Sequence, residues 1–332
     1  MSSGPSVSVV IPTFQRRGPV VEAVQSALAQ TRGDVEVIVV DDGSTDGTAD
    51  ALADIDRRVE VARRSNGGPA AARNTGIRHA RAPVVAFLDS DDRWRPGHLE
   101  EVLGLLDLHP AAILACAQAT ALGGDALERP AGLTNAAPAV LLGGLLYTSA
   151  VAVRRESVEA VGGFDEQLRV TEDSDMWCRL SLEGSFVLGG TATVQSGRHA
   201  VSLREEGRLA GAYPSAYERV ARRFVDRVAE TAHRRTPAES RRLAQAGRGW
   251  AAAARAIGAL AAGDTHRAEG ELASACRLFP ELAERPDRLV RRLGRSHPRW
   301  HEPEERERVL AWLVGVWPGA PWPFENLVGQ GA

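Results

Sequence analysis

The chain has 332 residues and a formal net charge of −3 at pH 7, which allows one large domain or two modest ones and provides no global basic field for nucleic-acid binding. A hydrophobic fraction of 44% with 25% charged residues is ordinary for a globular protein and excludes wholesale disorder. The chain has three cysteines without a CxxC pair, Cys116, Cys178 and Cys276, so we expect neither a disulfide framework nor a zinc site. The N-terminus lacks a signal pattern, so we expect a cytoplasmic protein or one that is peripheral to a membrane.

The first 110 residues alternate short apolar runs with helical stretches. Strands are predicted over residues 7–11, 35–40, 59–62 and 84–88. Helices are predicted over residues 19–30, 47–55, 69–79 and 96–109, with Asp46 capping the second and Pro69 at the start of the third. This alternation predicts a parallel sheet with right-handed crossovers.

The second half has a different character. A strand over 151–153, a turn at 162–165 and a helix over 171–182 are followed, from about residue 203, by Ala- and Arg-rich helices. Segments 250–262 and 266–279 read either as one tetratricopeptide-like pair or as a plain helical hairpin. The uncharged stretch 130–153 contains Pro and Gly and reads as a buried helix–turn–strand segment, so no transmembrane segment is expected.

Polar residues gather where the predicted strands end. These ends carry Pro12-Thr13, Asp41-Asp42, Arg63-Arg64 and the acidic run Asp89–Asp92. Ligands of parallel α/β sheets bind beyond the carboxyl ends of the strands, so the sequence predicts a binding site at this edge.

The three carboxylates of Asp89, Asp91 and Asp92 would repel one another without a cation among them. Mg²⁺ and Mn²⁺ accept sites with few carboxylates and keep positions for phosphate oxygens, and a bound metal would neutralise a departing diphosphate. The alternative is a solvated turn whose aspartates cap the next helix.

Two further acidic pairs have both a functional and a structural interpretation. A carboxylate of Asp41 or Asp42 could accept a hydrogen bond from a base N–H or a ribose hydroxyl, or simply form a turn. Glu172 and Asp173 open a helix, where the helix dipole favours acidic side chains, but one of them could also serve as a general base toward an acceptor hydroxyl.

Six segments, in this order, resemble glycosyltransferase family 2, which has the GT-A fold. They are VSVVIPTFQR (7–16), VIVVDDGSTDGT (37–48), NGGPAAARNTGI (66–77), VVAFLDSDDRWRPGHL (84–99), VGGFDE (161–166) and TEDSDMWCRL (171–180). The resemblance covers roughly residues 5–205. It implies a Rossmann-like, mostly parallel α/β sheet flanked by helices, with an all-α region after it, and we therefore expect a catalytic domain over 1–205 and a helical region over 206–332.

The same resemblance implies inverting transfer of a sugar from a nucleoside diphosphate donor, with Mn²⁺ or Mg²⁺ as cofactor. A UDP-sugar is the favoured donor, and a dTDP- or GDP-sugar is the alternative. By position in the motifs, the resemblance implies that Asp173 is the catalytic base with Glu172 as second candidate, and that Asp91 and Asp89 are metal ligands with Asp92 beside them. His199, after the last core strand, is expected as a further metal ligand, with an ordinary surface loop as the alternative. The expected nucleotide contacts are Pro12, Thr13, Asp41, Arg63 or Arg64, Asp89 and Ser90.

Several interpretations stay open. One alternative enzyme is a nucleotidyltransferase, which also uses paired acids on a metal. A non-enzymatic alternative is a catalytically inactive nucleotide-binding scaffold whose helical region is the functional part. The acceptor is a glycan, a peptide, a lipid-linked molecule or a small molecule. The aromatic C-terminal tail, with Trp300, Trp312, Trp317 and Trp322, either packs onto the helices or forms a homodimer contact or an acceptor platform.

Overall fold

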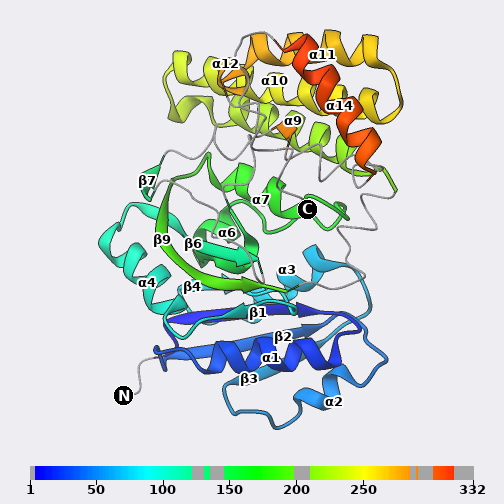
Figure 1. The fold of residues 1–332 in the computed structure, drawn as a ribbon. Coiled ribbons are helices and arrows are strands. Elements are labelled where there is room, and N and C mark those ends of the chain that lie inside the picture. Colours follow the sequence, from blue (N-terminus) through cyan, green and yellow to red (C-terminus); the bar gives the residue numbers. More distant parts are fainter. Residues whose placement is uncertain are drawn as a thin grey trace. The chain divides into compact units, whose positions relative to one another are not determined.

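The protein is described here from a computed structural model, which covers residues 4–121, 131–134, 146–197, 210–284, 289–290 and 302–317 (Figure 1). The chain divides into two compact units, residues 1–140 with 144–200, and residues 141–143 with 201–332. Among the described helices, none combines the length and the apolar character that a bilayer span requires.

The first four strands of the N-terminal unit form the predicted parallel ladder. β1 (Val7–Thr13), β2 (Val35–Asp41), β3 (Val59–Arg63) and β4 (Val84–Phe87) lie in the order β3-β2-β1-β4, and all three neighbouring pairs are parallel. Every residue of β1, β2 and β4 is buried, which explains why these strands appear as near-continuous apolar runs in the sequence. The buried polar side chains inside two of the runs, Ser8 and Glu36, hydrogen-bond to each other.

Helices connect these strands as the pattern predicts. They are α1 (Arg17–Leu28), α2 (Thr48–Leu52) and α3 (Pro69–His79). The chain steps outward from β1 to β3 and then returns to the other side of β1, so right-handed crossovers place α1 and α2 on one face of the sheet and α3 on the other. A β carbon at Gly76 of α3 would lie 2.3 Å from Val10 Cγ1, so glycine is what lets α3 lie directly against β1.

Later strands extend the sheet with mixed directions. β8 (Val151–Arg154) is antiparallel to β4, β6 (Ala112–Ala121) is antiparallel to β8, and β9 (Ser185–Ser196) is parallel to β6. The short strands β5 (Arg93–Trp94) and β7 (Gly132–Thr134) pair antiparallel with β9. Of these five strands, only β8 is predicted from the sequence. β6 is rich in Ala, which is a weak strand former, and Gly189 and Gly190 interrupt β9, so their pairing partners decide their form.

The remaining elements of this unit are α4 (His98–Leu108), the 3₁₀ turn η1 (Thr148–Ala150), α6 (Arg155–Ala160) and α7 (Glu172–Leu180). Helix α4 begins two residues after Pro96 rather than at it. Helix α7 is held by an aromatic cluster, in which the Phe164 ring centroid lies 5.4 Å from that of Phe87 and 6.0 Å from that of Trp177. Asn74 of α3 accepts a hydrogen bond from Phe164 N and donates one to Phe164 O, both at 2.8 Å, which ties α3 to the segment before α7.

The second unit is helical in its described part. It contains α9 (Tyr213–Glu230), the 3₁₀ turn η2 (Ala232–Arg234), α10 (Pro237–Ala261), α11 (Thr265–Leu278), α12 (Pro280–Ala283) and α14 (Pro303–Val316). The predicted hairpin is present as α10 and α11, but α10 begins at Pro237 instead of Trp250, behind a capping box formed by Thr236 and Glu239. The indole of Trp317 is buried and donates to Ala283 O at 3.1 Å, so this part of the tail packs onto the helices; Trp300 and Trp322 lie outside the described residues.

Candidate functional site

The ends of β1 and β2 bring two predicted nucleotide contacts together. Thr13 is paired with Asp41 in the parallel register, next to the Pro12–Val40 pair, and both Thr13 and Asp41 are buried. Asp41 Oδ1 accepts a hydrogen bond from Ser44 N at 2.9 Å. Within the described part of the chain, Asp41 Oδ2 and Thr13 Oγ1 are buried without a hydrogen-bond partner, a deficit of the kind that a bound ligand relieves.

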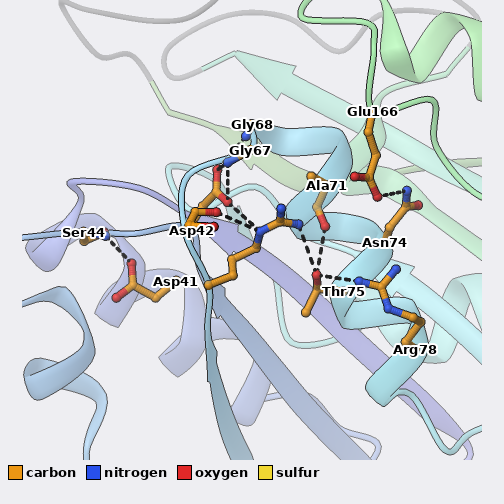
Figure 2. Close-up of polar contacts among 12 residues, drawn as sticks. Asp41, Asp42, Ser44, Gly67, Gly68, Ala71, Asn74, Thr75, Arg78 and Glu166 are labelled. Carbon is orange, nitrogen blue, oxygen red and sulfur yellow. Dashed lines mark hydrogen bonds and ion pairs between the residues drawn. The ribbon is translucent and has the colours of Figure 1, made fainter.

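The neighbouring Asp42 has a structural task. Its carboxylate accepts hydrogen bonds from Gly67 N at 3.1 Å and Gly68 N at 2.7 Å (Figure 2). Arg64 Nε lies 3.0 Å from the same carboxylate. Arg64 also donates to Thr75 on α3 at 3.2 Å, so its guanidinium is engaged. Arg63 differs, because its side chain is 62% exposed and Nε lies 3.4 Å from Asp41 Oδ2. Of the two arginines that the sequence left open, Arg63 is the one beside Asp41 and accessible to a ligand.

The acidic turn after β4 contains one inward-facing carboxylate. Asp92 is 2% exposed, and its Oδ2 lies 2.5 Å from Ser149 Oγ and 2.7 Å from the Tyr147 hydroxyl. Its Oδ1 accepts a hydrogen bond from Gly197 N at 2.9 Å. Burial, with the nearby charge of Asp89 added to it, raises the pKa of Asp92 to about 7. Asp92 therefore anchors the turn to η1 and to the end of β9.

The other two carboxylates of the turn are partly open to solvent. The Asp89 side chain is 31% exposed and the Asp91 side chain 23% exposed, whereas Ser90 between them is buried. Asp89 Oδ1 pairs with Arg73 Nη2 at 2.8 Å, and Asp91 Oδ2 pairs with Arg16 Nη1 at 2.6 Å. The three aspartates of the turn thus have different surroundings, which sequence spacing could not distinguish.

Arg73 of α3 joins this turn to the start of α7. Its guanidinium is 2.8 Å from Asp89 Oδ1 and 2.8 Å from Glu172 Oε1, and it lies over the ring of Phe164 at 5.4 Å. Burial alone lowers the pKa of Arg73, but the charges of Asp89 and Glu172 outweigh that effect and raise it above its usual value. Burial also raises the pKa of Glu172, to about 7, against the lowering effect of Arg73.

Asp173 is half-buried beside this pair. Its Oδ1 accepts a hydrogen bond from Ser174 N at 2.6 Å, and its other oxygen has no hydrogen-bond partner in the part of the chain that the structure describes. The preceding Thr171 is the N-cap of α7 and has a φ of 65°, a left-handed conformation that is costly for a β-branched residue. Such strained residues cluster at functional sites, where the surrounding structure enforces them.

The chemistry of the site fits a divalent metal that takes some of its ligands from the protein and the others from a bound substrate. Within the described ranges, no group of three or more His, Cys, Asp and Glu side chains could hold an ion by itself. Asp89 and Asp91 provide hard, partly exposed oxygens, and Mg²⁺ or Mn²⁺ commonly binds through one or two carboxylates together with substrate phosphates. His199 lies outside the described residues, and its role as a third ligand remains a prediction.

Five residues that line or support the site were not predicted. Arg16 and Arg73 lie inside recognised motif segments, and their charge was a visible signal with no stated partner. Tyr147 and Ser149 carried no signal, because only the packing of η1 against the acidic turn reveals them. Phe14, directly after β1, is one of the exposed large apolar side chains, at 45%.

Comparisons with known proteins agree on the kind of domain. Residues 8–148 match the family model described as Glycosyl transferase family 2. The putative teichuronic acid biosynthesis glycosyltransferase TuaG of Bacillus subtilis is 44% identical over 103 residues, which are 30% of this chain and 41% of that protein. The succinoglycan biosynthesis protein ExoW of Rhizobium meliloti is 42% identical over 127 residues, 36% of this chain and 39% of that protein. This chain therefore spans less than half the length of either relative.

Solved structures share the fold over a larger part of the chain. S. aureus TarS 1–349 in complex with UDP-GlcNAc superimposes with a TM-score of 0.65 at 17% identity, covering 92% of each chain. The mannosyltransferase PcManGT from Pyrobaculum calidifontis, in complex with GDP-Man and Mn²⁺, superimposes with a TM-score of 0.54 at 19% identity, covering 95% of this chain and 86% of the other. The architecture is thus GT-A-like, a mixed α/β sheet with helices and a helical C-terminal region.

Proposed function

From the family 2 glycosyltransferase region that residues 8–148 carry, we propose that the protein is an inverting glycosyltransferase that moves a sugar from a nucleoside diphosphate to an acceptor hydroxyl. The observation that carries the proposal is the double ion pair of Arg73, which holds a strand-end carboxylate and the acidic start of α7 on one guanidinium. A displacement at the sugar requires that an acid on the donor side and an acid on the acceptor side lie close together. Arg73 supports this arrangement, because it pairs with Asp89 after β4 and with Glu172 at the start of α7.

The nucleotide would bind at the ends of β1 and β2. Asp41 Oδ2 has no hydrogen-bond partner among the described residues, although Arg63 Nε lies 3.4 Å from it. It is therefore a buried acceptor for a ring N–H, which uracil, thymine and guanine have at the required edge. Thr13 Oγ1 lacks a partner among the described residues, and the exposed ring of Phe14 offers a stacking surface for a base. We favour a UDP-sugar, as in the TarS complex with UDP-GlcNAc, with dTDP- and GDP-sugars as alternatives.

The diphosphate would lie next to the acidic turn. Asp91, with Asp89 beside it, would hold Mn²⁺ or Mg²⁺, and the PcManGT complex contains Mn²⁺ with its donor. When bound, the metal supplies positive charge that stabilises the departing diphosphate. Asp92 keeps this turn in place through Tyr147 and Ser149.

We assign the general base to Asp173. Glu172 has a pKa near 7, which suits proton transfer, but its carboxylate is held by Arg73. Asp173 accepts a hydrogen bond from Ser174 N, and among the described residues no arginine pairs with it, so its carboxylate is the one without a cation that can accept a proton from the acceptor hydroxyl. Attack on the face opposite the diphosphate inverts the anomeric centre.

For the acceptor we propose a glycan, polymeric or lipid-linked, because two of the relatives are named for teichuronic acid and succinoglycan biosynthesis. The helical second unit would bind this acceptor or form a homodimer. We place the enzyme in the cytoplasm or at the membrane surface.

The test begins with a thermal-shift screen of nucleotide sugars with Mn²⁺, since a ligand that binds the folded state raises the apparent stability. The best donor is then incubated with enzyme and the release of nucleoside diphosphate is measured. We expect slow release by the wild type, none by Asp91→Ala or Asp173→Asn, and wild-type release by Asp107→Asn, which removes an exposed carboxylate on α4. Formation of a nucleoside triphosphate and a sugar 1-phosphate from the donor and added pyrophosphate would instead indicate a nucleotidyltransferase. Binding without any release in the presence of acceptors would indicate a scaffold.

A further inference from the structure

The ion pair between Arg16 and Asp91 lies where the proposed function needs a metal. Arg16 Nη1 is 2.6 Å from Asp91 Oδ2, and the two side chains are 22% and 23% exposed. A guanidinium and a divalent cation on the same carboxylate oxygen would repel each other, so Arg16 and a metal compete for Asp91 Oδ2. The donor-free chain therefore already has a positive charge on the carboxylate that we assign to the metal.

The backbone that presents Arg16 is strained and held in place. Gln15 has a φ of 52°, a left-handed conformation that side chains other than glycine rarely adopt. Gln15 N donates to Ser44 Oγ at 2.9 Å, Gln15 Nε2 donates to Thr45 Oγ1 at 2.9 Å, and Arg17 N donates to Asp46 Oδ2 at 3.1 Å. Thr45 N also donates to Gln15 Oε1 at 3.2 Å. Four hydrogen bonds to the loop after β2 thus hold this turn in its strained conformation, as expected where local strain serves a function.

Asp91 is fixed from the other side. The next residue, Asp92, is buried and hydrogen-bonded to Ser149 and Gly197, so the turn cannot withdraw from Arg16. A β carbon at Gly197 would lie 1.9 Å from Asp91 O, which shows how closely the end of β9 confines the Asp91 backbone. The Arg16–Asp91 contact therefore joins two constrained backbone segments through a single flexible side chain, that of Arg16.

We propose that Arg16 is a positioning residue that occupies the metal-binding oxygen of Asp91 until a diphosphate arrives, so that metal and nucleotide bind together. This inference rests on the proposed function, because it takes Asp91 as the metal ligand. The planar guanidinium matches phosphate oxygens as well as carboxylates, so a bound diphosphate gives Arg16 a second anionic partner. Releasing Asp91 then costs little, and the metal binds Asp91 and the phosphate oxygens together. Metal alone has to displace Arg16 without that compensation.

The prediction concerns Mn²⁺ binding, measured by titration calorimetry and by the electron paramagnetic resonance signal of free Mn²⁺, with and without UDP. For the wild type, Mn²⁺ binds weakly alone and much more tightly with UDP. Arg16→Gln should bind Mn²⁺ alone about tenfold more tightly than the wild type, since a charge-assisted contact of this exposure is worth on the order of that factor. The same variant should bind UDP more weakly, so the coupling between UDP and Mn²⁺ falls.

Arg17→Gln is the matched control. Arg17 is the adjacent residue, it is exposed, and its backbone rather than its side chain makes the hydrogen bond to Asp46. It removes the same charge from the same turn, so it measures the general electrostatic effect on cation binding. The gain in affinity for Mn²⁺ alone must be larger for Arg16→Gln than for Arg17→Gln. In an Asp91→Asn background, the gain from Arg16→Gln must vanish.

The outcomes separate this inference from the function beneath it. Suppose that the wild type with UDP binds Mn²⁺ through Asp91, but that Arg16→Gln without UDP binds Mn²⁺ no more tightly than Arg17→Gln does. The proposal that Arg16 occupies the metal-binding oxygen of Asp91 is then overturned, whereas the metal site itself stands. If neither the wild type nor Arg16→Gln binds Mn²⁺ with any of UDP, dTDP and GDP, the metal assignment and this inference fall together.

Discussion

Removing the guanidinium of Arg73 tests the link between the two halves of the site. In Arg73→Met the side-chain volume is largely kept, but Asp89 and Glu172 both lose their cation. Glu172 is 12% exposed and cannot recover full hydration, whereas Asp89 at 31% can recover part of it. Breaking a buried ion pair from one side costs about 3–5 kcal/mol, and the exposure of Asp89 places this case near the lower end.

A loss of about 3 kcal/mol corresponds to a fall of about 6–12 °C in the melting temperature of a unit of this size. The loss should also depend on pH. The pKa of Glu172 is raised from 4.5 to about 7 in the folded chain, so its contribution to stability is complete below about pH 4.5 and is lost as the pH rises through 7. Arg73 opposes that rise, and Arg73→Met should therefore lose more stability at pH 8 than at pH 5.

The measurement is urea unfolding at both pH values, with the double variant Arg73→Met, Glu172→Gln and the surface control Arg32→Met. Arg32 pairs with Asp34 at 3.1 Å, but the side chains are 36% and 41% exposed, so its loss should cost less than about 1 kcal/mol. Adding Glu172→Gln should recover part of the Arg73 loss, because the buried charge is then gone. An Arg73→Met protein as stable as Arg32→Met, with no recovery in the double variant, would refute the reasoning.

Three further predictions follow from single contacts. Asp173→Asn should abolish transfer while leaving the affinity for the nucleotide donor within about twofold by calorimetry, since it touches only the acceptor side; turnover near that of the wild type would contradict this. The pKa of Asp92 is raised from 3.8 to about 7, so the free energy of unfolding should fall as the pH rises through that window. In EDTA, Asp92→Asn should reduce the dependence of this free energy on pH by up to about 1.4 kcal/mol per pH unit. An unchanged pH dependence in urea unfolding would exclude the raised pKa of Asp92. Gly249→Ala in α10 would place a β carbon 2.6 Å from Phe279 Cβ and should lower the melting temperature through a loss of about 1–3 kcal/mol in stability. Gly270→Ala in α11, where nothing lies within 4 Å of the added carbon, should raise the melting temperature. Equal effects of the two substitutions would show that α10 is not tightly packed at Gly249.

The sequence by itself determined the first half of the sheet and the edge at which the candidate site is predicted. Buried parallel strands need continuous apolar runs, and the runs that became β1, β2 and β4 are long enough to be recognised without their neighbours. Since the carboxyl ends of parallel strands share one edge, Asp41 and the 89–92 turn could be assigned to one site before any coordinate was known. The first turn of α7, with Glu172 and Asp173, was likewise recognised from its motif.

Only the tertiary structure decided how the acidic residues divide their tasks. Arg73 and Glu172 are 99 positions apart, and Asp92 and Gly197 are 105 apart, so no local pattern links them. The same holds for β6, which is rich in Ala, and for β9, which Gly189 and Gly190 interrupt, because the form of both strands depends on pairing rather than on propensity. Burial and ion pairing depend on which distant side chains surround a carboxylate, and therefore the fold decided which aspartate anchors the turn and which ones remain open to a ligand.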